Sequence, residues 1–303
     1  MILCVGEILA DMIGMKKDGN VIYERKAGGA PFNVACAAKT FGAKTSFVGA
    51  VGADLIGEWL IEFVKNRNLD GGRVYLDETR NTTLAFVELD EQGERSFCFY
   101  RKNTADYHIP NLSNETVESA DIVHIGSLML SEESGAAFAK NLALKSRELG
   151  KLVSFDINFR TDIFRDKNAA LKAYGELIEL ADIVKFSEDE VDIFGESYVK
   201  EKLADKLVCI TLGKNGSKWL YKGKSGVAPT ICVKPVDTTG AGDAFYGGLL
   251  AKLDGVSSQN WTDEFLNEAF RFANVCGALN TLAYGAIDGL PSLETVENTL
   301  KNA

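Results

Sequence analysis

Short apolar runs that alternate with helical patterns constrain the fold of this chain more than any other sequence feature. The runs lack a strict alternation of apolar and polar residues, which is typical of parallel strands covered on both faces. The runs that we interpret as buried strands are 2–6, 45–52, 121–126, 151–158, 182–187 and 207–213. Their order predicts a doubly wound, mainly parallel α/β sheet, with a ligand crevice beyond the carboxyl ends of the strands.

The helical segments between these runs have recognisable ends. The first begins at Pro31 and is followed by Gly42, and such residues are common just inside the start and just past the end of a helix. The predicted helices are 31–41, 55–67, 132–149, 168–180, 241–253, 262–282 and 292–302. The chain after Gly240 is therefore expected to be mostly helical.

Two segments do not fit this alternation of buried strands and helices. Apolar and polar residues alternate in 21–29, and they alternate again in 82–102 on both sides of the turn sequence Asp-Glu-Gln-Gly at 90–93. Period two around such a turn predicts a hairpin, and these strands do not fit the parallel sheet. We interpret them as a small antiparallel β lid over the crevice, formed by about 12–30 and 81–107.

Charge and composition exclude several classes of partner. The chain has 33 basic and 43 acidic residues and a net charge of −10, which disfavours nucleic acids and anionic membranes but not a small phosphorylated ligand. No run approaches the roughly 18 apolar residues of a membrane span. The six cysteines form no C-x-x-C pair, so we expect buried, reduced thiols and a cytoplasmic location. No Pro/Gly/Ser-rich linker interrupts the chain, so core and lid are expected to form one domain over 1–303.

The stretch VDTTGAGDAFYGG (236–248) places a glycine turn at the start of a helix. The amides of Gly240, Ala241 and Gly242 fall where a helix has unpaired N–H groups and a positive dipole end, so they predict an anion-binding cradle. Asp243 would repel an anion there unless it takes a proton from an attacking hydroxyl. A turn that only caps the helix explains the same residues. The patterns of a Walker A loop and of a dinucleotide-binding oxidoreductase are missing.

A second glycine cluster, AGGAPFNVACAAKTFG, precedes the first helix. Asn33 lies in the first turn of that helix, where its amide serves either a local backbone group or the hydroxyls of a substrate. Asp11 follows the first strand and offers the same two interpretations. A carboxylate at the carboxyl end of a strand can accept two hydroxyls, which suits a sugar.

These motifs resemble those of the ribokinase-like (PfkB) carbohydrate kinases, and the resemblance covers essentially the whole chain. It rests on GGAPFNVA at 28–35, GAVGADLIG at 49–57 and DTTGAGDAF at 237–245. The resemblance implies a ribokinase-like three-layer α/β core with a β-sheet lid. It also implies ATP-dependent phosphorylation of a hydroxymethyl group, a requirement for Mg²⁺ and, in many members, activation by K⁺.

Carried over position by position, the resemblance implies roles for individual residues. Asp243 would be the catalytic base, and the amides of Gly240, Ala241 and Gly242 would form the anion hole. The residues implied to hold the sugar or to lie near the sugar and the phosphates are Asp11, Gly28, Gly29, Asn33, Asp156, Asn158 and Arg160.

The resemblance also implies a nucleotide site and two cation sites. Ser187 stands where the family usually has Asn, which puts the role of that position in doubt, whereas Glu190 matches the family and would orient Mg²⁺-bound water. The nucleotide-binding residues would be Ser187, Thr211, Gly213, Gly216 and Asn274. The residues near a K⁺ ion would be Asp237, Thr239, Asn280, Ala283 and Gly285.

The segment GERSFCFYRKNTADY resembles the lid of fructokinases in this family. Phe97, Phe99 and Arg101 share one strand face and are predicted to contact the sugar, although packing within the lid explains the aromatic pair as well. A guanidinium suits a carboxylate better than a neutral ketose, so a 2-keto-3-deoxygluconate kinase is the alternative to a fructokinase. A silent sugar-sensing protein on a kinase fold is a remote alternative. Exposed lid edges predict a homodimer through the lid.

Overall fold

The computed structural model describes residues 1–89, 95–160, 163–164 and 166–302, so the predicted turn at 90–93 lies outside the described residues. The core is built on a nine-stranded sheet with the order β13-β12-β11-β10-β9-β8-β1-β4-β5. Its strands are β1 (Ile2–Val5), β4 (Thr45–Gly52), β5 (Gly71–Asp77), β8 (Ile122–Ile125), β9 (Leu152–Asp156), β10 (Ile183–Ser187), β11 (Leu207–Thr211), β12 (Ser217–Tyr221) and β13 (Lys224–Ala228).

The predicted parallel strands pair as expected. β1 lies between β8 and β4, and the pairings from β8 through β11 are also parallel, so the mainly parallel sheet is confirmed. The sequence pattern did not indicate the three strands that complete the two sides of the sheet. β5 extends the parallel sheet beside β4, whereas β12 and β13 form an antiparallel hairpin on the other edge.

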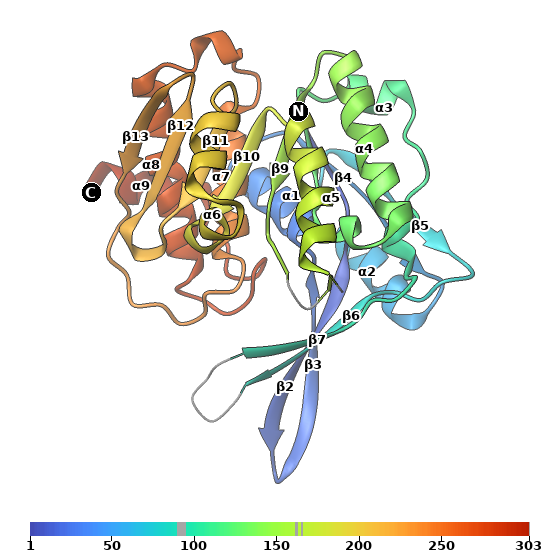
Figure 1. Ribbon diagram of the computed structural model, residues 1–303. Coiled ribbons are helices and arrows are strands. Elements are labelled where there is room, and N and C mark those ends of the chain that lie inside the picture. Colours follow the sequence, from blue (N-terminus) through green and yellow to red (C-terminus); the bar gives the residue numbers. More distant parts are fainter. Residues whose placement is uncertain (90–94, 161–162, 165, 303) are drawn as a thin grey trace.

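Helices cover both faces of this sheet and make the predicted three-layer core (Figure 1). Along β1, Ile2 and Cys4 belong to the apolar core of one face, with Phe32, Phe245 and Phe270, whereas Leu3 and Val5 belong to that of the opposite face, with Phe138 and Tyr174. The helices are α1 (Ala30–Thr40), α2 (Leu55–Lys65), α3 (Asn114–Glu118), α4 (Glu133–Glu148), α5 (Lys167–Leu180), α6 (Glu188–Phe194), α7 (Ala241–Leu253), α8 (Asp263–Asn280) and α9 (Leu293–Asn302). None of the described helices is both long and apolar enough to cross a bilayer.

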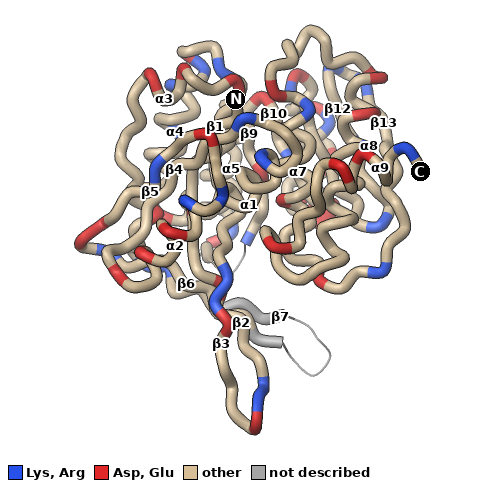
Figure 2. The backbone as a smooth tube through the Cα atoms, turned by 180° about the vertical axis from the view of Figure 1, so that it is seen from behind, with Lys and Arg blue, Asp and Glu red and all other residues tan. Residues whose placement is uncertain are grey.

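A second sheet projects from the core and corresponds to the predicted lid (Figure 1). It has the order β3-β2-β6-β7, with β2 (Leu9–Lys17), β3 (Asn20–Gly28), β6 (Leu84–Leu89) and β7 (Arg95–Tyr100). β2–β3 and β6–β7 are antiparallel pairs, and the two hairpins are joined by a parallel β2–β6 pairing. β2 follows β1 directly and β3 leads into α1, so the lid is continuous with two elements of the core. Figure 2 shows basic and acidic residues interspersed along both parts.

Candidate active site

The candidate site lies where strands β1, β9 and β10 end and helices α1 and α7 begin. Asn33, in the first turn of α1, donates a hydrogen bond through Nδ2 to Oδ2 of Asp243, in the first turn of α7, at 2.9 Å. The two helices approach closely because Gly247 has no side chain, since a Cβ there would lie 2.5 Å from that of Ala37. Helix packing therefore joins two predicted residues that are 210 positions apart.

The predicted anion cradle forms the start of α7. Gly240 has a φ of 74°, the left-handed conformation that glycine adopts at no steric cost, and a side chain there would overlap Ala286. The amide of Ala241 donates to the carbonyl of Thr238 at 3.3 Å. Gly242 is exposed, so the first turn of α7 is open to a ligand. Its geometry suits an anion because the positive end of the helix dipole lies there.

Asp243 has the electrostatic setting expected of a general base. Burial raises the pKa of Asp243 to about 6, and the hydrogen bond from Asn33 opposes this rise. The charge of Asp156 raises the pKa further, and the charge of Lys185 lowers it. The side chain is partly accessible, so it remains within reach of a substrate. A carboxyl group with a pKa near the working pH is well suited to accept a proton.

A buried ion pair that the sequence did not reveal lies beside this carboxylate. Lys185 on β10 donates through Nζ to both carboxylate oxygens of Asp156 on β9, at 2.9 and 2.8 Å. The two residues are partners in the parallel register of the strands. The sequence offered one signal, which is a lysine inside an otherwise apolar strand, DIVKFS.

The predicted sugar-binding residues gather at the base of the lid. Asp11 lies on β2 and Gly28 at the end of β3, and a side chain at Gly28 would overlap the Asp11 carboxylate. Gly29 follows with a φ of 109° at the N-cap of α1, four positions before Asn33. The register of the β2–β3 hairpin thus brings these residues together at the entrance to α1.

The segment after β9 carries the other predicted residues of this group. Asn158 has a positive φ of 39°, which turns the chain away from the strand. Arg160 is exposed, and its charge acts on Asp243. Asp156 thus ends β9, and Asn158 and Arg160 follow it on the side of the sheet where the cradle lies.

The predicted aromatic and arginine face of β7 is only partly described. The backbone of Phe97 pairs with Val87, and its side chain lies outside the described part of the structure. Phe99 pairs with Ala85 and is partly buried.

Arg101 directly follows β7 and is buried, with 7% of its surface exposed. Its Nε and Nη2 both donate to Oδ2 of Asp106, at 2.9 and 2.5 Å. Its Nη1 donates to the Tyr107 hydroxyl at 2.8 Å and to the Leu128 carbonyl at 2.6 Å. Since most donors of the guanidinium are engaged within the protein, its charge is already compensated before any sugar binds.

The predicted nucleotide residues lie at the ends of β10 and β11 and on α8. Thr211 ends β11, and Gly213 and Gly216 bound the following turn with φ values of 55° and 90°. Asn274 is buried in α8 and donates through Nδ2 to the Ala228 carbonyl at 2.9 Å. In this conformation the Asn274 amide therefore anchors the end of β13.

Ser187 and Glu190 form a capping box at the start of α6. The Ser187 hydroxyl accepts from the Glu190 amide, and the Glu190 carboxylate accepts from the amides of Ser187 and Phe159, both at 2.7 Å. The Ser187 hydroxyl therefore caps the start of α6 at the position where the family usually has the longer side chain of Asn. Because both carboxylate oxygens hold backbone amides, Glu190 fits Mg²⁺ through water and phosphate rather than as a direct ligand. The described residues contain no cluster of metal-ligating side chains that would form a complete metal cage.

The predicted monovalent-cation loop packs against the cradle. Asp237 accepts from the amides of Thr239 and Gly285, both at 2.9 Å. Within the described part of the chain, Oδ1 of Asn280 is buried without a hydrogen-bond donor, and Ala283 lies in the same loop. A buried oxygen of this kind fits a cation, so the loop matches the chemistry of a K⁺ site.

A second residue that sequence reasoning missed is Glu7. It follows β1, has no exposed surface, and neither of its carboxylate oxygens has a hydrogen-bond partner among the described residues. Burial raises the pKa of Glu7 to about 7, the charge of Arg101 opposes that rise, and the charge of Asp243 adds to it. The sequence offered one signal for Glu7, which is an acidic residue directly after the apolar run 2–6, in GEILAD.

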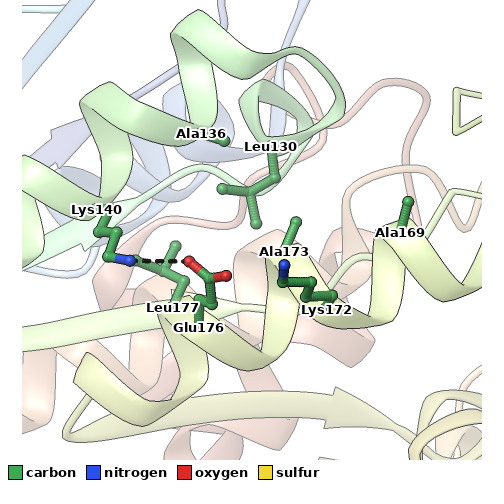
Figure 3. A pocket seen from close by; sticks show the side chains of 8 residues that line it. All are labelled: Leu130, Ala136, Lys140, Ala169, Lys172, Ala173, Glu176 and Leu177. Carbon is green, nitrogen blue, oxygen red and sulfur yellow. Dashed lines mark hydrogen bonds and ion pairs between the residues drawn. The ribbon is translucent and has the colours of Figure 1, made fainter.

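A surface cavity of about 210 Å³ between α4 and α5 is separate from these residues (Figure 3). Lys140 and Glu176 form an ion pair of 2.9 Å across it, beside apolar side chains such as Leu177. None of the residues predicted for catalysis or binding lines this cavity.

The fold and the cradle define a class of enzymes that transfer a phosphoryl group to a hydroxyl. Residues 1–293 match the family model described as pfkB family carbohydrate kinase, and the chain belongs to this family. A curated relative, probable fructokinase-7 of Arabidopsis thaliana, is 34% identical over 100% of this chain and 93% of its own length.

Solved structures of fructokinases match this chain over nearly its whole length. Fructokinase with bound ATP from Xylella fastidiosa has a TM-score of 0.90 and 29% identity, covering 99% of this chain and 98% of its own. Fructokinase from Vibrio cholerae O395 in a form with bound fructose, ADP and calcium ion has a TM-score of 0.87 and 30% identity, covering 98% and 97%.

Proposed function

We propose that this protein is an ATP-dependent fructokinase that converts D-fructose and ATP to fructose 6-phosphate and ADP. The observation that carries the proposal is Asp243, a carboxylate with a raised pKa inside the anion cradle of α7, oriented by Asn33. Fructokinases among the curated relatives and the solved structures support the choice of sugar.

The geometry supports a direct displacement. Asp243 accepts the proton of the attacking hydroxyl, a bond forms between that oxygen and the γ-phosphorus, and the bond to the ADP oxygen breaks. The amides at the start of α7 stabilise the negative charge on the transferred group. Asp11, Gly28, Gly29 and Asn33 orient the sugar at the base of the lid, and the turn after β11 receives the nucleotide. Lid closure then excludes water.

Arg101 favours a neutral sugar over the keto-deoxy acid. A guanidinium that binds a substrate carboxylate needs two adjacent N–H groups with no partner inside the protein. In Arg101 most of the N–H groups already donate to Asp106, Tyr107 and Leu128. An anionic sugar is therefore disfavoured.

We further propose that Mg²⁺ and K⁺ assist the reaction. Mg²⁺ supplies charge neutralisation to the ATP phosphates, and Glu190 would orient its water. Asn280 and the carbonyls near Ala283 and Gly285 would hold K⁺. Gly240 packs against Ala286 of the same loop, so order in the loop supports the shape of the cradle.

A homodimer through the lid is also proposed. The lid exposes apolar side chains that a second copy of the chain would cover, and its edge strands offer unpaired backbone groups. The side chains concerned are Met15, Val21, Ile22, Tyr23 and Tyr100. A cytoplasmic location is proposed from the free cysteines, of which Cys98 and Cys232 are exposed rather than buried as expected.

A panel of sugars tests the proposed function. ADP release is measured with D-fructose, 2-keto-3-deoxygluconate and D-ribose, with Mg²⁺, and with and without K⁺. We expect the highest kcat/KM with fructose, and stimulation by K⁺. A higher kcat/KM with the keto-deoxy acid, or ADP release that no sugar increases, contradicts the proposal.

A further inference from the structure

The mechanism proposed above assigns no step to the buried Lys185–Asp156 ion pair, although both charges act on Asp243. Only 8% and 6% of the two side chains are exposed. Taking two charges out of water is costly, and an ion pair repays that cost only when its geometry is excellent. Burial disfavours the charge of Lys185, but the charges of Asp156, Glu190 and Asp243 and the hydrogen bonds to Asp156 together raise the pKa of Lys185, so the ammonium remains charged. A charged pair therefore persists in the core of the enzyme.

The pair lies directly beneath the cradle. A Cβ built on Gly242 would meet only Lys185 among its non-local neighbours, at 3.6 Å from Nζ. The same Nζ lies 5.9 Å from the ring centroid of Tyr246, one helical turn further along α7. Lys185 thus reaches from the sheet to the side of the first turn of α7 that faces the sheet.

Five groups from different elements act on Asp243 at this point. Asn33 from α1 donates a hydrogen bond to it, Asp156 from β9 and Lys185 from β10 act with opposite charge, and Arg160 acts from the segment after β9. Glu7, after β1, interacts with it as a like charge. Lys185 is the buried cation of this set, since Arg160 is exposed.

We propose that Lys185 and Asp156 act together as positioning residues of phosphoryl transfer, which rests on the proposed kinase function. Lys185 stabilises the ionised carboxylate of Asp243 and supplies positive charge beneath the cradle, where the incoming phosphoryl group brings negative charge. Asp156 holds the ammonium of Lys185 in place through two hydrogen bonds, and its negative charge limits how far Lys185 lowers the pKa of Asp243. The pair thereby keeps Asp243 ionised enough to accept a proton yet basic enough to hold it.

Two substitutions of equal size separate this role from a merely structural one. Lys185→Gln removes the positive charge, and Asp156→Asn removes the negative charge. The titration of the Asp243 carboxyl is followed by ¹³C NMR in protein labelled at Asp, and its resonance is assigned by its loss in Asp243→Asn. We expect the midpoint to rise by about one pH unit in Lys185→Gln and to fall by a similar amount in Asp156→Asn.

The double variant Lys185→Gln/Asp156→Asn is the matched control, because it leaves no unpaired buried charge and retains the volume of the pair. Its Asp243 midpoint is expected within about half a pH unit of the wild-type value, and its kcat is expected to fall at least tenfold. Lys185→Arg, which keeps the charge, is expected to restore most of the wild-type midpoint. Shifts in the same direction in both single variants, or no shift in either, overturn the proposal.

The NMR titration needs no substrate, so it tests the pair independently of the sugar. If the sugar panel fails while the opposite shifts appear, the proposed function is wrong and the electrostatic role of the pair stands. If the panel succeeds while the shifts are absent, the pair has only a structural role. A double variant with wild-type kcat also contradicts the proposal, because the charge beneath the cradle would then be dispensable.

Discussion

Removal of the Asp106 charge tests how the lid is joined to the core and how the enzyme selects its sugar. Asp106 Oδ2 holds two nitrogens of Arg101, and Oδ1 accepts from the hydroxyls of Thr83 and Thr104, both at 2.7 Å. Only 1% of each charged side chain is exposed. In Asp106→Asn the guanidinium stays buried without its counterion, while the volume is unchanged.

The expected cost follows from the burial of the pair. Breaking a buried ion pair by removing one partner destabilises a protein by about 3–5 kcal/mol. The amide oxygen still accepts from Arg101, so we place the loss at about 3 kcal/mol. For a chain of 303 residues, with an unfolding entropy of about 2.1 cal/mol/K per residue, such a loss lowers Tm by about 5 °C. Glu176→Gln is the control, because its exposed pair with Lys140 is expected to leave Tm unchanged.

The assay combines thermal unfolding with sugar specificity. We expect Asp106→Asn to raise kcat/KM for 2-keto-3-deoxygluconate relative to fructose, since the freed guanidinium can pair with a carboxylate. A Tm equal to that of Glu176→Gln would refute the energetic reasoning. A wild-type enzyme that already uses the acid as well as fructose would refute the argument about selection.

Three further predictions concern the cradle and the sugar site. Because the pKa of Asp243 is about 6, log(kcat/KM) is expected to fall with a slope of about one as the pH drops below 6, and to be constant above it. An inflection below pH 5 in the pH–rate profile would contradict this prediction. Gly240→Ala forces a left-handed φ and a contact with Ala286, so we expect a loss of about 1–3 kcal/mol in denaturant unfolding and a lower kcat. Gly28→Ala displaces the Asp11 carboxylate and is expected to raise the KM for fructose at least tenfold with little change in the KM for ATP, as steady-state kinetics will show.

The parallel core was predictable because its strands are continuous apolar runs. β12 and β13 were missed because neither is a continuous apolar run: β12 alternates between buried and half-buried residues, and β13 is mostly exposed. The available signal was the turn between them, where Lys222 and Gly223 both have the positive φ that a tight hairpin requires. The β2–β6 pairing could not be predicted, since the choice of strand neighbours across a long separation leaves no local trace in the sequence.

Individual site residues were easier to predict than the contacts between them. Asn33 and Asp243 each belong to a recognisable motif, but their hydrogen bond depends on how α1 packs on α7. Lys185 and Glu7 were missed because a charged residue in or just after an apolar strand has no meaning until its neighbours are known. Arg101 was predicted at the sugar, and only the structure reveals that Asp106 already engages it.

The role of Asp243 is tested most directly by Asp243→Asn, which alters one charge and keeps the acceptor for Asn33. We predict a kcat lowered by about 10²–10⁴-fold, with fructose and ATP still binding in calorimetry. Since the pKa of Asp243 rises from an unfolded value of about 4 to about 6, the native state binds more protons and loses stability as the pH rises through this window. At pH 7.5 the variant is therefore expected to be more stable than the wild type. Wild-type turnover, or a lower Tm, would contradict the assignment of Asp243 as the partly buried base of a sugar kinase.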